Sequence, residues 1–185
     1  MTSDQTFEEF AEKLFNKYLE LNPQHGSSLG LHEYDGKVGD ISEKVLKEEI
    51  GIYKKLLDEL NSINRNDLSD INKYDYDVAK WGLESELFDL DVIKAYKRNP
   101  MVYAFSFGGI EYYISREYAP FDERLSSINK FWIASLKHLP THRKILKSLC
   151  LKYYAVMLKT FLSTMKTFSK INFLLSLKKK AKIKS

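Results

Sequence analysis

The sequence predicts an all-α protein, an antiparallel helical domain with a long glycine-rich loop after its first helix. Three observations lead to this fold class. Apolar residues recur at spacings of three and four over most of the first 130 positions, which is the period of one helix face. No stretch shows the strict alternation of apolar and polar residues that indicates a half-buried strand. Half of the eight glycines gather in one region, between Leu21 and Asp40.

The first helix is expected at the N-terminus. We expect Asp4 or Thr6 to cap its start. Pro23 should end it, because the residue before a proline is pushed out of the α region. The amphipathic pattern predicts that one face packs against a core. That face consists of Phe7, Phe10, Ala11, Leu14, Phe15, Tyr18 and Leu19.

The loop that follows reads LNPQHGSSLGLHEYDGKVGD, and it holds two of the four histidines. His32 and Asp35, with His25 nearby, could be read as metal ligands or as a histidine–carboxylate pair. HEYDG begins like a zinc-binding HExxH helix but lacks the second histidine, and a zinc site needs three or four protein ligands. We therefore predict no metal site and no cofactor in this chain, and favour His32 and Asp35 as hydrogen-bond partners of the loop's own backbone.

Two further long helices should follow the loop. One starts after a cap at Asp40 or Ser42 and continues to about Ile63, and the next begins near Leu68 or Ser69. The second of these carries two apolar stripes, which predicts a helix packed on more than one side. One stripe consists of Ile71, Tyr74, Val78, Trp81, Ser85 and Phe88, and the other of Ala79, Leu83, Leu87 and Leu90.

The same helix carries a dense series of carboxylates. Paired acids can act as general acid and base, but so many on one helix are typical of a solvated or salt-bridged face, which is the interpretation we favour. The series consists of Asp75, Asp77, Glu84, Glu86, Asp89 and Asp91.

The third part of the helical region contains an apolar run and a corner. The run extends from Met101 to Ile114, with a break or kink possible at Gly108-Gly109, and the segment REYAPFDER at 116–124 forms the corner. Pro120 can start a helix that reaches Leu139. Arg116 and Arg124 could clamp a carboxylate ligand, although a salt bridge to a neighbouring acid is the favoured alternative.

The net charge of +4 conceals a division of the chain. Residues 1–130 hold 16 basic and 25 acidic residues, a charge of −9, whereas residues 131–185 hold 13 basic residues and no acid. We interpret 131–185 as a basic tail, the product of a truncation or a frame shift. The alternative is a basic amphipathic helix that lies on an anionic membrane or binds a partner groove.

The loop resembles the N-terminal signature of the domain-of-unknown-function 885 family, a pattern close to NPxxxSxLGxHxYDxxxxD. Two later motifs also resemble the family: Asn99-Pro100 followed by Tyr103, and the corner at 116–120 with Arg124. The resemblance covers about residues 5–130. The loop residues that match are Asn22, Pro23, Ser28, Leu29, Gly30, His32, Tyr34, Asp35 and Asp40.

The resemblance implies a mostly helical protein similar in architecture to zinc peptidases of the HExxH type. Family members are about three times as long as this chain of 185 residues, and their metal-binding helix lies beyond its end. No catalytic residue can therefore be carried over, and zinc is expected only in a full-length member, where a peptide would be the substrate. The residues that we regard as candidates for binding are His32, Tyr34, Asp35, Arg116 and Tyr118.

These observations favour the N-terminal helical part of a zinc-metallopeptidase-like protein, inactive by itself. One alternative is a stand-alone helical binding module that uses the loop, and another is a protein that binds a membrane surface or nucleic acid through its basic tail. We do not expect nucleic-acid binding, because the −9 body repels a polyanion. A single cysteine and the lack of a signal peptide or transmembrane stretch predict a cytoplasmic protein.

Overall fold

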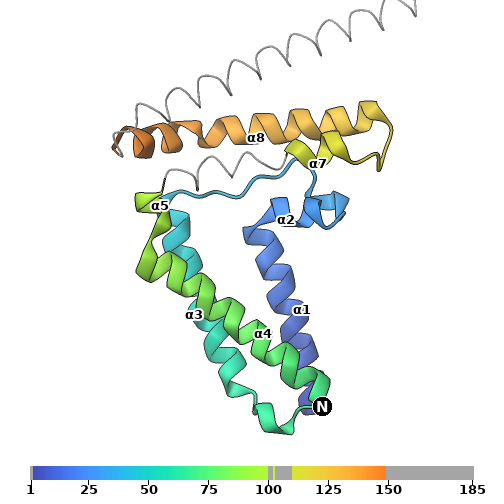
Figure 1. Cartoon of the computed structure of the whole chain (residues 1–185), viewed down its shortest axis with the longest axis vertical. Coiled ribbons are helices and arrows are strands. Elements are labelled where there is room, and N and C mark those ends of the chain that lie inside the picture. Colours follow the sequence, from blue (N-terminus) through green and yellow to red (C-terminus); the bar gives the residue numbers. More distant parts are fainter. Residues whose placement is uncertain (1, 100–101, 103–109, 149–185) are drawn as a thin grey trace, which may run out of the picture. The chain divides into compact units, whose positions relative to one another are not determined.

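The computed structural model describes residues 2–99, 102 and 110–148, and within these residues it contains helices and no strand (Figure 1). The predicted all-α fold class is confirmed. Residues Met1–His142 form one compact unit and Arg143–Ser185 another. No helix break occurs at residue 130, since α8 (Phe121–Ser148) passes through it. The division of the chain at residue 130 stays a prediction, and residues 149–185 of the tail lie outside the described residues.

Helix α1 (Ser3–Leu21) begins earlier than predicted, after an N-cap at Thr2. The Thr2 hydroxyl accepts a hydrogen bond from the Gln5 amide, and the Gln5 side chain accepts one from the Thr2 amide. This reciprocal pair satisfies two amides at the helix start, so the predicted caps Asp4 and Thr6 were wrong. The helix ends at Leu21, before Pro23, as predicted.

The expected loop contains two short helical pieces. Pro23 ends α1 but also opens α2 (Pro23–Ser28), because a proline suits the first turn of a helix, where no amide donor is needed. A 3₁₀ turn, η1 (His32–Tyr34), follows. The prediction of one long loop from Leu21 to Asp40 was therefore wrong in part.

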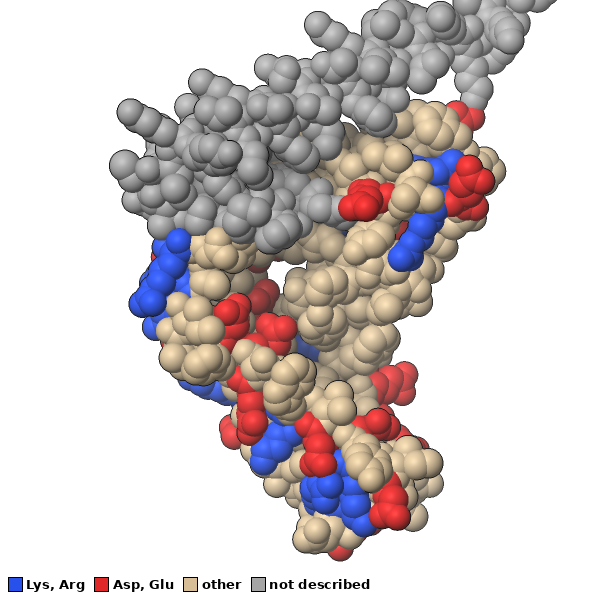
Figure 2. Space-filling model, viewed as in Figure 1, with Lys and Arg blue, Asp and Glu red and all other residues tan. Residues whose placement is uncertain are grey.

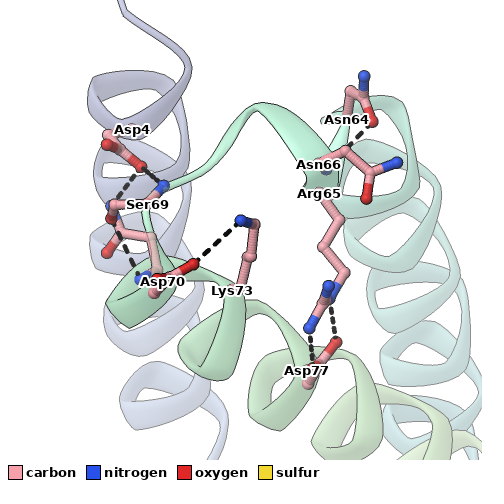
Figure 3. A network of polar contacts seen from close by, with 9 residues as sticks. Asp4, Asn64, Arg65, Asn66, Ser69, Asp70, Lys73 and Asp77 are labelled. Carbon is pink, nitrogen blue, oxygen red and sulfur yellow. Dashed lines mark hydrogen bonds and ion pairs between the residues drawn. The ribbon is translucent and has the colours of Figure 1, made fainter.

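Helices α3 (Glu43–Ser62) and α4 (Asp70–Leu87) are joined by the 3₁₀ turn η2 (Arg65–Asp67). Ser42 and Ser69 cap the two helices, in agreement with the sequence. Figure 3 shows the polar contacts at this end of the molecule. The Asp4 carboxylate accepts from the Ser69 amide and from the Asn72 side chain, both at 2.9 Å. Asp4 therefore ties the start of α1 to the start of α4.

Helices α1, α3 and α4 pack together around the main apolar core. The rings of Phe7 on α1 and Tyr76 on α4 lie 6.1 Å apart and are tilted. Of the two stripes on α4, the one with Ala79, Leu83 and Leu87 packs against this core. The buried members of the core are Phe7, Phe10, Tyr53, Leu56, Leu60, Leu68, Tyr76 and Leu83.

The other apolar stripe of α4 faces solvent. Its large side chains, on Ile71, Tyr74, Val78, Trp81 and Phe88, are between 55% and 76% exposed. The sequence predicted that this helix packs on more than one side, and in the described part of the chain only one side is covered. A continuous exposed stripe of this kind is unusual for a helix that has no further contact.

A π-helical turn, η3 (Phe88–Ile93), ends α4, and α5 (Ala95–Arg98) follows Lys94, whose φ of 53° places it in the left-handed region. The apolar run expected at 101–114 is described only at 102 and in α7 (Ile110–Ser115), so the expected kink at Gly108-Gly109 lies outside the described residues. Helix α8 follows Pro120, as predicted, and extends beyond Leu139.

A second group of buried residues lies on α7 and α8. Tyr113 and Phe131 pack edge to face, with ring centroids 6.1 Å apart. Ile128 and Ser135 are buried on the same helix as Phe131. None of the helices in the described ranges is long and apolar enough to span a membrane.

Candidate functional site

The loop after α1 and the corner after α7 meet through side chains more than 80 residues apart in the sequence. The Tyr118 hydroxyl donates to Oδ2 of Asp35 at 3.0 Å, and the same oxygen lies 3.2 Å from Nδ1 of His32. The rings of His32 and Tyr118 stack, with centroids 4.2 Å apart and planes inclined by 16°. Three of the five predicted binding residues therefore form one cluster.

Asp35 is the centre of this cluster. Its side chain is 11% exposed, whereas that of His32 is 51% exposed. Burial raises the pKa of Tyr118, and its hydrogen bond to Asp35 acts in the same direction. The sequence favoured backbone partners for His32 and Asp35, and the partners that the structure gives them are each other and Tyr118. His32 is the most exposed member of the cluster.

Tyr113 fixes the loop beneath this cluster. Its hydroxyl accepts a hydrogen bond from the Gly36 amide at 2.9 Å and donates to the Ser27 hydroxyl at 3.1 Å. Burial is the main reason that the pKa of Tyr113 is raised. Gly36 has a φ of +80°, and a Cβ at this position would lie 2.5 Å from Cβ of Lys130. The loop therefore packs directly on α8, and the space admits only a glycine.

Arg116 and Arg124 bond to main-chain oxygens. Arg116 donates to the carbonyl of Ser28 at 2.6 Å, which is a second link from the corner to α2. Arg124 donates to four carbonyl oxygens within the corner, those of Tyr113, Ile114, Arg116 and Ala119. These bonds stabilise the corner, in place of the carboxylate clamp or the internal salt bridge that the sequence suggested.

Tyr34 and His25 lie apart from the His32 cluster. The Tyr34 ring covers Gly26, where an added Cβ would lie 2.5 Å from Cγ of the ring. His25 stacks on Tyr18 and shares a short hydrogen bond with its hydroxyl. Tyr34 is therefore a packing residue of the loop, and His25 belongs to a different group of side chains.

The acidic series on α4 and the following turn is partly salt-bridged. Asp77 receives two hydrogen bonds from Arg65, each of 2.7 Å, and Asp91 pairs with Lys54 at 2.9 Å. These hydrogen bonds lower the pKa of both carboxyl groups. Glu86 is the exception in the series, because partial desolvation of its exposed side chain and the charge of Asp89 raise its pKa.

The sequence did not reveal the roles of Tyr113 and Arg124. Tyr113 lies in an apolar run, and its position in the sequence predicts a core residue. Nothing in the periodicity indicates that its hydroxyl forms hydrogen bonds with Gly36 and Ser27. Among the described residues, no three His, Cys, Asp or Glu side chains lie close enough together to hold a metal ion. The chemistry that the His32 cluster offers is hydrogen bonding and stacking at one half-exposed imidazole.

No family model and no curated protein matches this sequence. A solved structure of "a putative lipoprotein of unknown function" from Shewanella oneidensis matches with a TM-score of 0.66 and 21% sequence identity. The match covers 79% of this chain and 26% of that chain. This chain therefore spans about a quarter of the length of that protein, and the likeness shows a common fold.

Proposed function

We propose that residues 5–130 are the N-terminal helical part of a zinc-peptidase-like protein of the domain-of-unknown-function 885 family, without catalytic activity of their own. The observation that carries the proposal is the contact between two of the three motifs on which the resemblance rests, the loop and the corner. His32 and Asp35 come from the first motif and Tyr118 from the second, and they form one hydrogen-bonded, stacked cluster. Motifs that are far apart in sequence and meet in space are expected to serve one structural or binding purpose.

Two further observations support the proposal. The Shewanella oneidensis protein, whose fold is similar over 79% of this chain, is about three times as long, as expected for a full-length member of the family. The stripe on α4 around Trp81 is exposed here, and additional helices of a longer protein would cover it. In such a protein the half-exposed His32 would line one side of a cleft and contact a peptide substrate.

The first test of this proposal is the DNA sequence of the gene. Translation of the two other reading frames beyond codon 130 should reveal an HExxH segment downstream of the basic tail. If neither frame encodes one, the proposal fails, and the stand-alone helical binding module that uses the loop is then the favoured function. The tail-based alternative depends largely on residues 149–185, which lie outside the described residues.

The longer protein, which is produced when the other reading frame is translated beyond codon 130, allows a second test. This test concerns the surface of α4. With Trp132 replaced by Phe, Trp81 is the remaining tryptophan of this part of the chain, and acrylamide quenching reports its exposure. Any tryptophans that the longer frame adds are replaced in the same way. We expect strong quenching in the short chain and weak quenching in the longer protein, with Trp81→Phe as the control for background. Equal quenching in the two proteins would show that no added helix covers α4.

A further inference from the structure

A second group of polar side chains lies where the end of α1 and the short helix α2 meet α3 and α4. The Tyr18 hydroxyl bonds to Nδ1 of His25, and the two rings stack with centroids 5.4 Å apart. Tyr53 on α3 shares a side-chain hydrogen bond with Asn22, and the charges of Glu49 and Glu86 both act on it. We call these residues, Tyr18, His25, Glu49, Tyr53 and Glu86, the α1–α4 junction.

Glu49 occupies a position where an apolar residue is expected. The buried face of α3 runs through Leu46, Glu49, Tyr53, Leu56 and Leu60, at alternating spacings of three and four. Glu49 is 9% exposed. No group among the described residues donates a hydrogen bond to its carboxylate or forms an ion pair with it. A buried carboxylate without a partner is costly in free energy.

The charges around Glu49 increase this cost. Burial is the first cause that raises its pKa to about 7, and the negative charges of Glu86 and Asp40 contribute to the same shift. Partial desolvation and the charge of Asp89 also raise the pKa of Glu86, and His25 opposes these effects. In the part of the chain that the structure describes, no Lys or Arg forms an ion pair with Glu49 or Glu86.

The opposite end of the same helix pair shows the usual solution to this problem. Asn72 is the buried polar residue there, and its side chain donates to Asp4 at 2.9 Å and to Glu8 at 3.3 Å. Polar groups inside this bundle are thus satisfied at one end and left without a partner at Glu49. The difference indicates that a group from outside the described residues completes the junction.

The members of the junction differ in their exposure to solvent. Glu49 and Tyr53 are buried, Tyr18 is half-buried, and Glu86 and His25 are exposed. The group therefore has a buried acidic floor and an exposed rim. Figure 2 shows acidic side chains over α4 on the face drawn there, with Lys and Arg side chains among them.

We propose that the α1–α4 junction binds a primary ammonium group on the buried carboxylate of Glu49, with Glu86 at the exposed rim. A buried carboxylate without a partner can accept a charge-assisted hydrogen bond from an ammonium, and the ring of Tyr18 supplies an aromatic surface for a cation. A metal ion fits less well, because the described residues do not bring three His, Cys, Asp or Glu side chains together. The site is separate from the His32 cluster and does not depend on the function proposed above.

The ammonium can come from a lysine side chain or from the amino terminus of a peptide. Both are tested by calorimetric titration of the whole chain at about pH 7.5, where Glu49 is largely ionised and both amines are largely protonated. One probe is Nα-acetyl-lysine amide and the other is glycylglycine amide. The same molecules with the amine acetylated are the matched controls. If only the first probe binds, the site recognises a lysine side chain. If only the second binds, it recognises an amino terminus. If both bind, it is a general ammonium site.

Variants locate the binding. Glu49→Gln and Glu86→Gln should each lower the affinity for the probe that binds by about tenfold or more, equivalent to about 1.4 kcal/mol. Glu48→Gln removes an exposed charge from the same turn of α3 and should leave the affinity within about twofold. Since Glu86 is exposed, its variant keeps the test valid if Glu49→Gln does not fold.

Four results would overturn the proposal. These are no binding of either unacetylated probe, equal binding of the acetylated controls, unchanged affinity in Glu86→Gln, and an equal loss of affinity in Glu48→Gln.

The pH dependence of the affinity is a further test. Affinity should fall as the pH drops from about 7.5 to 5.5, because Glu49 takes up a proton in that range. A flat profile would assign the binding to another site.

Discussion

Replacement of Glu49 by glutamine should stabilise the protein, and only at high pH. The carboxyl group has an ordinary pKa of 4.5, and burial next to Glu86 raises it to about 7 in the folded protein. At about 1.4 kcal/mol for each pH unit, this difference corresponds to roughly 3 kcal/mol. Ionised Glu49 therefore destabilises the fold by up to about that amount, and glutamine has the same shape without the charge.

The sign follows from proton binding. A carboxyl with a raised pKa binds its proton more tightly in the folded protein, so the stabilisation is complete below about pH 4.5 and is lost as the pH rises through about 7. The unfolding free energies of the variant and the natural chain should therefore be similar near pH 4.5 and should separate by about 2–3 kcal/mol near pH 8.5. Asp4, Asp77 and Asp91, whose pKa values are lowered, act at lower pH and equally in both proteins.

Urea denaturation followed by circular dichroism measures this difference at a series of pH values. Glu48→Gln, at an exposed position, should show no pH-dependent gain and serves as the control. The reasoning is refuted if Glu49→Gln is less stable than the natural chain at about pH 8.5, or if its advantage is the same at every pH.

Three further predictions concern the loop and metal binding. Asp35→Ala leaves Tyr118 and His32 without their common partner and should lower the unfolding free energy by about 1–3 kcal/mol; an unchanged urea midpoint would contradict this. Gly36→Ala should destabilise more than Gly30→Ala, because both have positive φ but only Gly36 lies against α8, and equal midpoints for the two would argue against the observed packing. Elemental analysis of the purified chain should find no stoichiometric zinc, and one retained zinc per chain would show that a metal site exists.

The contacts that form the His32 cluster could not be predicted from the sequence. The signature residues mark the loop and the corner as specified regions, but no local pattern indicates that Tyr118 reaches Asp35 or that Tyr113 reaches Gly36. Hydrogen bonds between side chains depend on where the chain returns after many residues. The resemblance selected three residues that belong together, His32, Asp35 and Tyr118, and two that stabilise the loop or the corner separately.

By itself, the sequence determined the helices and most of their ends. Spacings of three and four place apolar residues on one face, and serine caps and prolines stop or start a helix through local backbone chemistry, as Ser42, Ser69 and Pro120 do. Only the tertiary structure decided which face is covered. The two stripes of α4 look alike in sequence, yet one packs on α1 and α3 and the other is exposed. The same holds for Glu49. A glutamate is expected to be solvated, but the neighbours of Glu49 bury it. Periodicity fixes which residues share a face, but burial depends on what packs against that face, and that is a property of the whole fold.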